Sequence, residues 1–379
     1  MTHETILTNA RLVLPERVLH GTLLLRDGRI AAIDTGPSAA PGAIDCEGDT
    51  LIPGIVDLHT DNLERQVQPR ASARWPSRSA LVAHDAQCAV AGVTTVFDAL
   101  CLGDLGFDRE RVRTFHEGMA DLAALDGTGL LRSTHYLHLR CELPAPDMLD
   151  LVRGAIDDPR VRMLSMMDHS PGVGQYADIG YWRRLRARDG LNEAELDRKI
   201  AHLQDQRARL REPNRRTLLD LLVGRPIVLA SHDDETEAEI AANRADGIAI
   251  SEFPVTLIAA KAARAAGMHV IAGAPNIVRG GSHSGNVKVA DLIAAEAVDA
   301  LASDYVPASL VEAAFLCAAR GMRDLPGAIG MITDLPARMA GLADRGRIAT
   351  GLRADLVRVA DHAGLAVVRA TWRGGARVA

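Results

Sequence analysis

Eight short apolar runs, rich in β-branched residues, recur along the middle of the chain and are separated by longer amphipathic stretches. The runs cover residues 55–59, 93–100, 134–142, 161–169, 226–232, 247–253, 268–274 and 300–304. The intervening stretches, such as 79–91 and 109–125, have the length and spacing of helices. Eight strands alternating with helices predict a parallel (β/α)8 barrel of the TIM type. An open doubly wound sheet is disfavoured, because no Gly-x-Gly-x-x-Gly motif follows an early strand.

Both ends of the chain have a different pattern, in which short alternating segments surround glycine and aspartate residues. Strands are predicted there at residues 5–14, 23–33, 355–359, 365–368 and 371–373. We therefore expect residues 1–50 and 346–379 to form one composite β-sandwich, and residues 51–345 to form the barrel.

One segment inside the barrel region, residues 182–216, is rich in charge and has the composition of one or two exposed helices. In the simpler interpretation this segment is a solvated helical face. In the alternative interpretation its arginines form a cationic lid that attracts an anionic substrate. The charge pattern alone leaves both interpretations open.

Residues able to bind a metal or transfer a proton lie at the C-terminal ends of the predicted barrel strands. They are Asp57, His59, Asp61, Asp98, Arg140, Glu142, Asp168, His169, His232, Asp233, Asp234, Glu235, Glu252, Asn276 and Asp304. Because these strand ends meet at one mouth of a barrel, the side chains are expected to converge there. His59 and Asp61 are two positions apart on an extended segment, so both point the same way and can bind one ion. Imidazole together with carboxylate is typical of zinc, manganese or iron sites.

Each of these residues also has a structural interpretation. A lone histidine at a strand end is more often a hydrogen-bonded loop residue than a ligand, and Asp233 or Asp234 suits the N-cap of the next helix. Glu252 could likewise serve the following turn. The concentration of histidine and carboxylate at one rim nevertheless favours a metal site. Three of the remaining histidines, His84, His116 and His202, are interpreted as surface or packing residues. His135 and His138 lie inside the third strand, where either a place in the barrel interior or a role in supporting the metal ligands is open.

Composition narrows the class of protein further. The chain has 379 residues, enough for a barrel of about 250 residues and a smaller unit. Its net charge of −6 gives no reason to expect a nucleic-acid or membrane partner, and no apolar run reaches the roughly 18 residues of a membrane span. The five cysteines form no Cys-x-x-Cys pair and no signal peptide is visible, so we expect free thiols and a cytoplasmic location.

Two segments carry a family resemblance. Residues 51–61, LIPGIVDLHTD, resemble the first barrel strand of the amidohydrolase superfamily, which has a Pro-Gly turn followed by Ile-Asp-x-His-x-His. Residues 346–357, GRIATGLRADLV, resemble the return of that family's chain into its terminal sandwich. The resemblance extends over nearly the whole chain. It implies a metal-dependent hydrolase with one or two divalent ions, zinc being expected and manganese or iron the alternatives.

The sequence departs from the superfamily pattern at two places. Asp61 stands where the second histidine is usual, and none of the three lysines (Lys199, Lys261 and Lys288) follows a strand as the usual bridging lysine does. A carboxylate, Glu142 or Asp168, would then bridge two ions. The resemblance implies Asp304 as the catalytic base, with Glu235 and Glu252 as reserve ligands. The implied metal ligands are His59, Asp61, Glu142, His169, His232 and Asp304.

The motifs HTDN, LHLRCE, MMDHSPG, LASHDDET, SEFP and GAPNIVRGGSHSGN resemble one branch of this superfamily, which acts in phosphonate metabolism. The resemblance implies that the substrate is a small phosphorylated sugar, a ribose methylphosphonate triphosphate, hydrolysed to its 5-phosphate and pyrophosphate. The glycine-rich loop 274–286 follows the seventh predicted strand, near the usual phosphate site of such barrels, and Arg279 can bind two anionic oxygens. The candidate substrate-binding residues are Arg70, Arg140, Asn276, Arg279, Ser282 and His283. For Arg140 the alternative is a contact that holds Glu142 in place.

Two other classes remain open at this stage. A cyclic amidohydrolase or nucleobase deaminase of the same superfamily would have a similar metal site, and residues 232–235, HDDE, resemble the fifth strand of the deaminases. Such substrates need few cations, whereas the loop around Arg279 and the arginine-rich segment favour a polyphosphate. A non-catalytic scaffold is disfavoured, because the chain retains a full set of metal ligands. No partner-binding motif is visible, and a homodimer is one option for the assembly.

Overall fold

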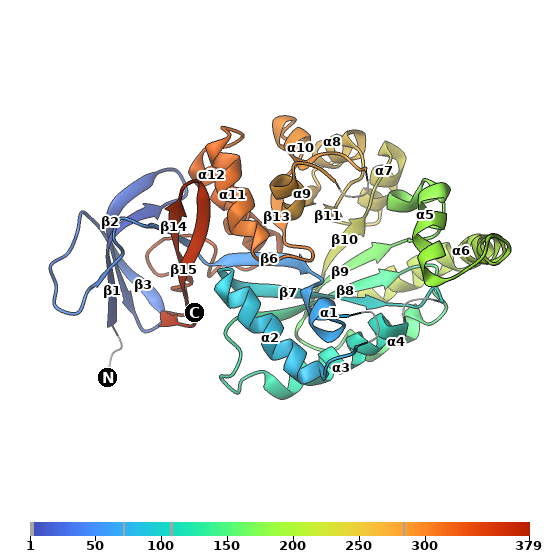
Figure 1. Cartoon of the computed structure of the whole chain (residues 1–379), viewed down its shortest axis with the longest axis horizontal. Coiled ribbons are helices and arrows are strands. Elements are labelled where there is room, and N and C mark those ends of the chain that lie inside the picture. The colour runs from blue at the N-terminus through green and yellow to red at the C-terminus, as the bar shows by residue number, and fades with distance from the viewer. Residues whose placement is uncertain (1–3, 71–72, 107–108, 283–284) are drawn as a thin grey trace.

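The computed structural model of the protein describes residues 4–70, 73–106, 109–282 and 285–379. Figure 1 shows a barrel of strands wrapped by helices and, beside it, a smaller sheet that contains the ends of the chain. The arrangement confirms the predicted (β/α)8 barrel with a β unit built from both termini.

Eight parallel strands form the barrel, and they are neighbours in the order in which they occur in the sequence. They are β6 (Ile55–Thr60), β7 (Val93–Leu102), β8 (Thr134–Glu142), β9 (Val161–Met167), β10 (Val228–His232), β11 (Ile250–Glu252), β12 (His269–Gly273) and β13 (Ala300–Ala302). Each coincides with one of the eight apolar runs. The period of strand and helix along the sequence was therefore sufficient to predict the barrel.

The barrel closes where its first and last strands meet. Thr60 and Asp304 form a parallel bridge, and the Asp304 amide donates to the His59 carbonyl at 3.0 Å. The Asp61 amide in turn donates to the Asp304 carbonyl at 2.6 Å. Backbone hydrogen bonds thus hold three of the predicted site residues side by side at the mouth.

Apolar side chains fill the barrel below this mouth. The cluster includes Val56, Leu58, Phe97, Met163, Ala230, Ile250, Ile271 and Ala300, all of them buried. A filled interior is usual in barrels of this size, because eight strands leave only enough space for side chains. A ligand can therefore enter only at the rim.

Helices surround the strands. They are α1 (Asn62–Val67), α2 (Ser77–Val90), α3 (Arg109–Leu125), α4 (Met148–Ala155), α5 (Ile179–Arg186), α6 (Glu193–Leu222), α7 (Glu237–Ala245), α8 (Leu257–Ala265), α9 (Ala274–Arg279), α10 (Val289–Ala294), α11 (Ser309–Ala319), α12 (Leu325–Gly330) and α13 (Asp334–Met339). The predicted glycine-rich loop thus begins with a short helix, α9, which ends at Gly280 in the left-handed region. Among the described residues, no helix combines the length and the hydrophobicity that a bilayer span requires.

The terminal sheet joins segments from both ends of the chain in the order β16-β15-β14-β5-β1-β2-β3, and β4 pairs with β1. Its strands are β1 (Glu4–Val13), β2 (Val18–Arg26), β3 (Arg29–Thr35), β4 (Ile44–Asp45), β5 (Thr50–Pro53), β14 (Leu356–His362), β15 (Leu365–Arg373) and β16 (Ala376–Arg377). Only Gly54 separates β5 from the first barrel strand. A Cβ at Gly54 would lie 2.7 Å from the Cβ of Asp355, so this close junction requires glycine.

The charged segment forms α5 and α6, between β9 and β10, at the side of the barrel away from the terminal sheet (Figure 1). α6 begins with a capping box made by Asn192 and Glu195. One side of this helix is buried, through Leu196, Leu203 and Leu218. The segment is therefore packed against the barrel by an apolar stripe, while its other side carries most of the charge.

Candidate metal centre and substrate pocket

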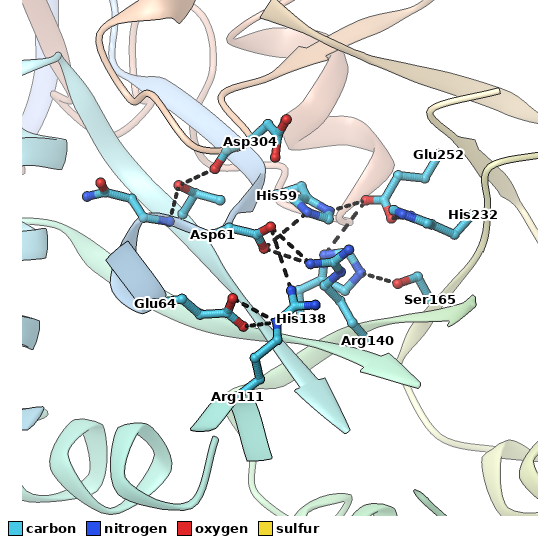
Figure 2. A network of polar contacts seen from close by, with 12 residues as sticks. His59, Asp61, Glu64, Arg111, His138, Arg140, Ser165, His232, Glu252 and Asp304 are labelled. Atoms are coloured by element: carbon cyan, nitrogen blue, oxygen red, sulfur yellow. Dashed lines mark hydrogen bonds and ion pairs between the residues drawn. The ribbon is translucent and has the colours of Figure 1, made fainter. Parts of the chain in front are cut away.

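Glu252 lies fully buried at the end of β11, between histidines from two other strands. Its Oε1 accepts a hydrogen bond from His59 Nδ1, and its Oε2 accepts one from His232 Nδ1, both at 2.8 Å. Although burial opposes ionisation, the charge of His59 and these hydrogen bonds hold the pKa of Glu252 well below its usual value. Since an ionised carboxylate can only accept, both Nδ1 atoms carry a proton, and in the neutral form of each imidazole Nε2 is the nitrogen available to a ligand. Figure 2 shows the two imidazoles on either side of this carboxylate.

Glu142, at the end of β8, has the same relation to a third histidine. Its Oε2 accepts from His169 Nδ1 at 2.7 Å, and its Oε1 accepts from the His169 amide at 2.8 Å. Burial opposes the ionisation of Glu142, but the charge of His169 and these hydrogen bonds lower its pKa. Glu142 was predicted to be a metal ligand, whereas in the structure both of its oxygens are engaged with His169. We therefore interpret it as the residue that orients this histidine.

Asp61 and Asp304 complete a first cluster with His59, and their ligand atoms lie within 4.8 Å of one another. Arg140 donates to both oxygens of Asp61, at 2.8 and 3.0 Å, and so holds the carboxylate beside His59. Asp304 has a left-handed backbone, with φ +54°. Burial, and then the negative charge of Asp61, raise the pKa of Asp304 to about 7, which suits a group that exchanges protons near neutral pH.

A second cluster, made of His169, His232 and Asp233, lies beside the first, again with ligand atoms within 4.8 Å of one another. His169 Nε2 is 3.8 Å from Asp233 Oδ2, and His232 Nε2 is 3.8 Å from Asp233 Oδ1. The sequence places Asp233 among the strand-end residues able to bind a metal and also offers it as a helix cap, and its place in this cluster depends on a left-handed turn that the sequence does not reveal. Imidazole and carboxylate donors with buried, unsatisfied atoms (His169 Nε2 and Asp233 Oδ2 among the described residues) fit a divalent metal ion.

Both clusters open into one pocket of about 550 Å³, a size that suits a small organic ligand. Its wall carries several uncharged polar side chains, among them Asn276, Ser282 and Asn286. It also carries four arginines from different elements, namely Arg111, Arg140, Arg186 and Arg279. The chain as a whole is negatively charged, so the arginines of this pocket form a local concentration of positive charge that runs counter to the net charge. Such a wall attracts an anionic ligand with more than one charged group.

Contacts from the surrounding elements position these arginines. Arg111 on α3 pairs with Glu64 at 2.9 Å and lies 3.9 Å from Asp61 (Figure 2). Arg279 at the end of α9 donates to the Tyr305 hydroxyl at 3.3 Å. Arg186 comes from α5, within the charged segment, and its side chain is only 18% exposed. The position of Arg186 therefore favours the interpretation of the charged segment as a cationic lid.

Several predicted site residues have other positions in the structure. Arg70 is exposed and is not among the residues lining the pocket, so we do not assign it to substrate. Asp168 cannot serve as the bridging carboxylate, because its Oδ2 pairs outward with Arg207 of α6 at 2.6 Å. Asn276 lines the pocket but also accepts from the Val289 amide at 3.0 Å, which holds the following loop. His283 lies outside the described residues, and the reserve residue Glu235 is not part of the pocket wall.

A separate polar network is buried between α2 and the barrel wall. His84 Nε2 donates to Asp98 at 2.6 Å, and His135 Nδ1 donates to the other oxygen of Asp98 at 2.8 Å. His135 Nε2 contacts Asp85 at 3.2 Å, and Asn62 donates to His84 Nδ1 at 2.9 Å. His84, expected to be a surface or packing residue, is thus a buried hydrogen-bonded one. Because direct hydrogen bonds already occupy these nitrogens, we interpret the network as structural.

The chain matches no family profile. Over 376 residues it is 40% identical to the alpha-D-ribose 1-methylphosphonate 5-triphosphate diphosphatase of Escherichia coli (strain K12), covering 98% of this chain and 100% of that protein. A stretch of 98 residues, 25% of this chain, is 32% identical to an L-hydantoinase of Paenarthrobacter aurescens, of which it covers 20%.

Solved structures with similar folds include the N-acetyl-D-glucosamine-6-phosphate deacetylase of Mycobacterium smegmatis, with a TM-score of 0.62, 17% identity and 99% of each chain covered. Another is the 5-methylcytosine deaminase of Klebsiella pneumoniae, with a TM-score of 0.61 and 16% identity over 99% of this chain and 98% of that one. At these identities the similarity concerns the fold.

Proposed function

This chain is a hydrolytic enzyme of the amidohydrolase superfamily and belongs to the family of the Escherichia coli diphosphatase, and from that premise we propose its substrate. It hydrolyses alpha-D-ribose 1-methylphosphonate 5-triphosphate to the 5-phosphate and pyrophosphate, a step in the breakdown of phosphonates. The observation that supports this most directly is the meeting of two oriented histidine–carboxylate clusters and four arginines in one pocket. A substrate with a phosphonate at one end and a triphosphate at the other needs both features.

The superfamily is metal-dependent, and the residues that would hold metal here are His59, Asp61 and Asp304 in one cluster and His169 and His232 in the other. Zinc is the first candidate, with manganese or iron as alternatives. When bound, such an ion polarises a phosphoryl oxygen and makes water more acidic. The carboxylates Glu142 and Glu252 keep the three imidazoles in the tautomer that can coordinate it.

The other steps belong to the side chains of the chain itself. Asp304 accepts the proton of the attacking water as the new bond to phosphorus forms. The anhydride bond then breaks, and pyrophosphate leaves with the bonding electrons. Arg279, with Ser282 nearby in the pocket wall, neutralises the charge that develops on this leaving group. Arg140 keeps Asp61 in place and adds positive charge beside the reacting phosphate.

A substrate panel tests the proposed class of reaction. Purified, metal-supplied protein is offered the ribose methylphosphonate triphosphate, 5-methylcytosine and hydantoin at equal concentrations, and release of pyrophosphate, ammonia and the ring-opened amide is followed. We expect pyrophosphate alone. Ammonia or ring opening without pyrophosphate would assign the pocket to a deaminase or a cyclic amidohydrolase, the two alternatives with a similar metal site.

A further inference from the structure

The loop and the helix that follow β9 bring Tyr176 and Arg186 into the pocket wall, where the proposed reaction gives neither residue a step. We propose that these two side chains form a subsite for the methylphosphonate group of the substrate, across the pocket from the arginine that receives pyrophosphate. The inference rests on the proposed function, because it presupposes a sugar with an anionic group at each end. It concerns binding, so it can be tested without turnover.

The pocket extends between two sides of the barrel mouth. The eight strands are neighbours in the order β6 to β13, so in the closed ring β9 lies opposite β13. Tyr176 and Arg186 follow β9, whereas Arg279 follows β12, the neighbour of β13. In the view of Figure 1, α5 is accordingly farther from the terminal sheet than α9 is. A phosphate that reacts at the histidines of this mouth therefore has an arginine on either side.

The phase of α5 directs Arg186 inward. Trp182 is fully buried and packs in the main apolar core. Arg186 comes four residues later and is therefore on the same face of the helix. Arg184, two residues after Trp182, points the other way, and its side chain is 69% exposed against 18% for Arg186. The sequence of this one helix thus places one arginine in the pocket and its near neighbour in solvent.

Ring contacts hold Tyr176 at the same end of the pocket. It is the last residue of a short 3-10 helix, η1 (Gly174–Tyr176). The ring of Tyr181, from α5, stacks on it with centroids 6.3 Å apart, and the His169 ring meets it in a T-shaped contact at 5.8 Å. Within the part of the chain that the structure describes, the Tyr176 hydroxyl makes no hydrogen bond. It is therefore available to a ligand.

The electrostatic surroundings of Tyr176 support its place beside two cations. Burial raises the pKa of Tyr176, and the positive charges of Arg186 and Arg111 oppose that rise. The phenol is therefore protonated at neutral pH and can donate a hydrogen bond to an anionic oxygen. The two arginines near it supply the charge that such an oxygen requires.

The chemistry of this subsite matches a methylphosphonate ester. The ester carries one negative charge shared by two oxygens, which a guanidinium can bind with two parallel N–H groups. Its methyl group is apolar and can pack on the ring of Tyr176. Pyrophosphate has more charge and no apolar group, and the opposite wall offers it Arg279 with the polar side chains of Ser282 and Asn286.

The test compares two ligands that differ only in the phosphonate, namely ribose 1-methylphosphonate 5-phosphate and ribose 5-phosphate, with pyrophosphate as a third probe. Calorimetry measures the Kd of each ligand for the metal-supplied wild type, Arg186→Ala, Tyr176→Phe and the control Arg184→Ala. Circular dichroism checks the folding of each protein. Tyr176→Phe keeps the ring contacts and removes only the hydroxyl, so it tests the subsite even if Arg186→Ala fails to fold.

We expect the wild type and Arg184→Ala to bind the phosphonate sugar at least about tenfold more tightly than ribose 5-phosphate. Arg186→Ala should lose most of this preference and Tyr176→Phe part of it, while both variants bind pyrophosphate as the wild type does. A wild type without the preference would refute the proposal, and so would variants that weaken both sugars equally. Weaker binding of pyrophosphate to Arg186→Ala, with the preference intact, would reverse the orientation of the substrate and also overturn it.

These outcomes are separate from those of the proposed reaction. No triphosphate is cleaved in the binding experiment, so a protein that prefers the phosphonate sugar but does not hydrolyse the triphosphate would contradict only the reaction. A protein that releases pyrophosphate but binds both sugars equally would contradict only the subsite.

Discussion

Glu252 shows how one residue can organise a site without lining the pocket. It is fully buried, and it holds one histidine of each cluster through a separate oxygen. The sequence placed it at a strand end but ranked it only as a reserve ligand, because a glutamate after a strand has several ordinary roles. Its function depends on the distance between β6 and β10, which is a property of the closed barrel.

Replacing this carboxylate by an amide, Glu252→Gln, should disturb both histidines. The amide offers one acceptor oxygen, so one of the two Nδ1–H groups must lose its partner or change tautomer. We expect metal affinity and kcat/KM to fall about 10- to 100-fold. Zinc titration and steady-state kinetics measure these losses, with exposed Glu237→Gln on α7 as the control. Equal affinities in the two variants would contradict the orienting role.

Asp304→Asn tests the assignment of Asp304 to the reacting centre, as general base and as a residue that would hold metal. Asparagine tolerates the left-handed backbone at this position, so the fold and the bridge to Thr60 should persist. Loss of a general base predicts a fall in kcat of about 10²- to 10⁴-fold. Pyrophosphate release measures turnover, and circular dichroism measures folding. Near-normal turnover in a folded variant would remove Asp304 from the mechanism.

At the scale of elements, two parts attach to the barrel wall in different ways. α2 is held by the buried network of His84, Asp98 and His135. The charged segment is held by the apolar stripe of α6 and by the pairing of Arg207 with Asp168, directly before His169. Its α5 contributes Arg186 to the pocket, so one arginine of the charged segment is part of the site.

The α2 network predicts a pH dependence of stability. Burial disfavours the charged form of His135, but Asp98 and Asp85 outweigh burial and raise its pKa from 6.5 to about 9. The folded chain then binds a proton that the unfolded chain releases. The stabilisation is complete below pH 6.5 and is lost as the pH rises through 9, by up to about 3 kcal/mol. Urea unfolding at pH 6, 8 and 10 measures it. His135→Gln should flatten this part of the curve, and parallel curves for the two proteins would contradict the assignment.

Arg186→Ala tests whether α5 takes part in substrate binding. Because this mostly buried guanidinium lines the pocket, its loss should raise KM for the sugar triphosphate about tenfold or more, with a smaller effect on kcat. Arg184→Ala, on the exposed side of the same helix, is the matched control. Initial-rate kinetics on the three proteins distinguish the outcomes. An unchanged KM for Arg186→Ala would favour the simpler interpretation, in which the charged segment is a solvated helical face.

At the scale of the whole molecule, the alternation of apolar runs and helices was enough to predict the barrel, and the short β segments at both ends predicted the terminal sheet. The convergence of His59, His169, His232 and Asp304 also followed, since strand ends of a barrel share one rim. The direction in which each strand-end side chain points was harder to predict. Asp168 and His169 are adjacent in an extended segment, so they point to opposite sides, and only the histidine reaches the pocket.

Other parts of the site depend on geometry that no local pattern contains. Arg111 lies on the helix after β7 and reaches the pocket only because α3 packs beside α1. Asp233 reaches the second cluster through a left-handed turn, with φ +57°. Sequence reasoning therefore located the mouth and most of the histidine and aspartate side chains that gather there. It did not assign Glu142 and Glu252 their role in orienting the histidines, and it missed Arg111 in the pocket wall.

Phosphorus NMR tests the proposed reaction most directly. Metal-supplied protein is incubated with alpha-D-ribose 1-methylphosphonate 5-triphosphate, with a chelator-treated sample beside it. The structure and the family predict that the triphosphate signals are replaced by those of pyrophosphate and a sugar 5-phosphate, and that chelator prevents the change. A folded, metal-loaded protein that leaves the triphosphate intact would contradict the assignment of this pocket to phosphoric-anhydride hydrolysis.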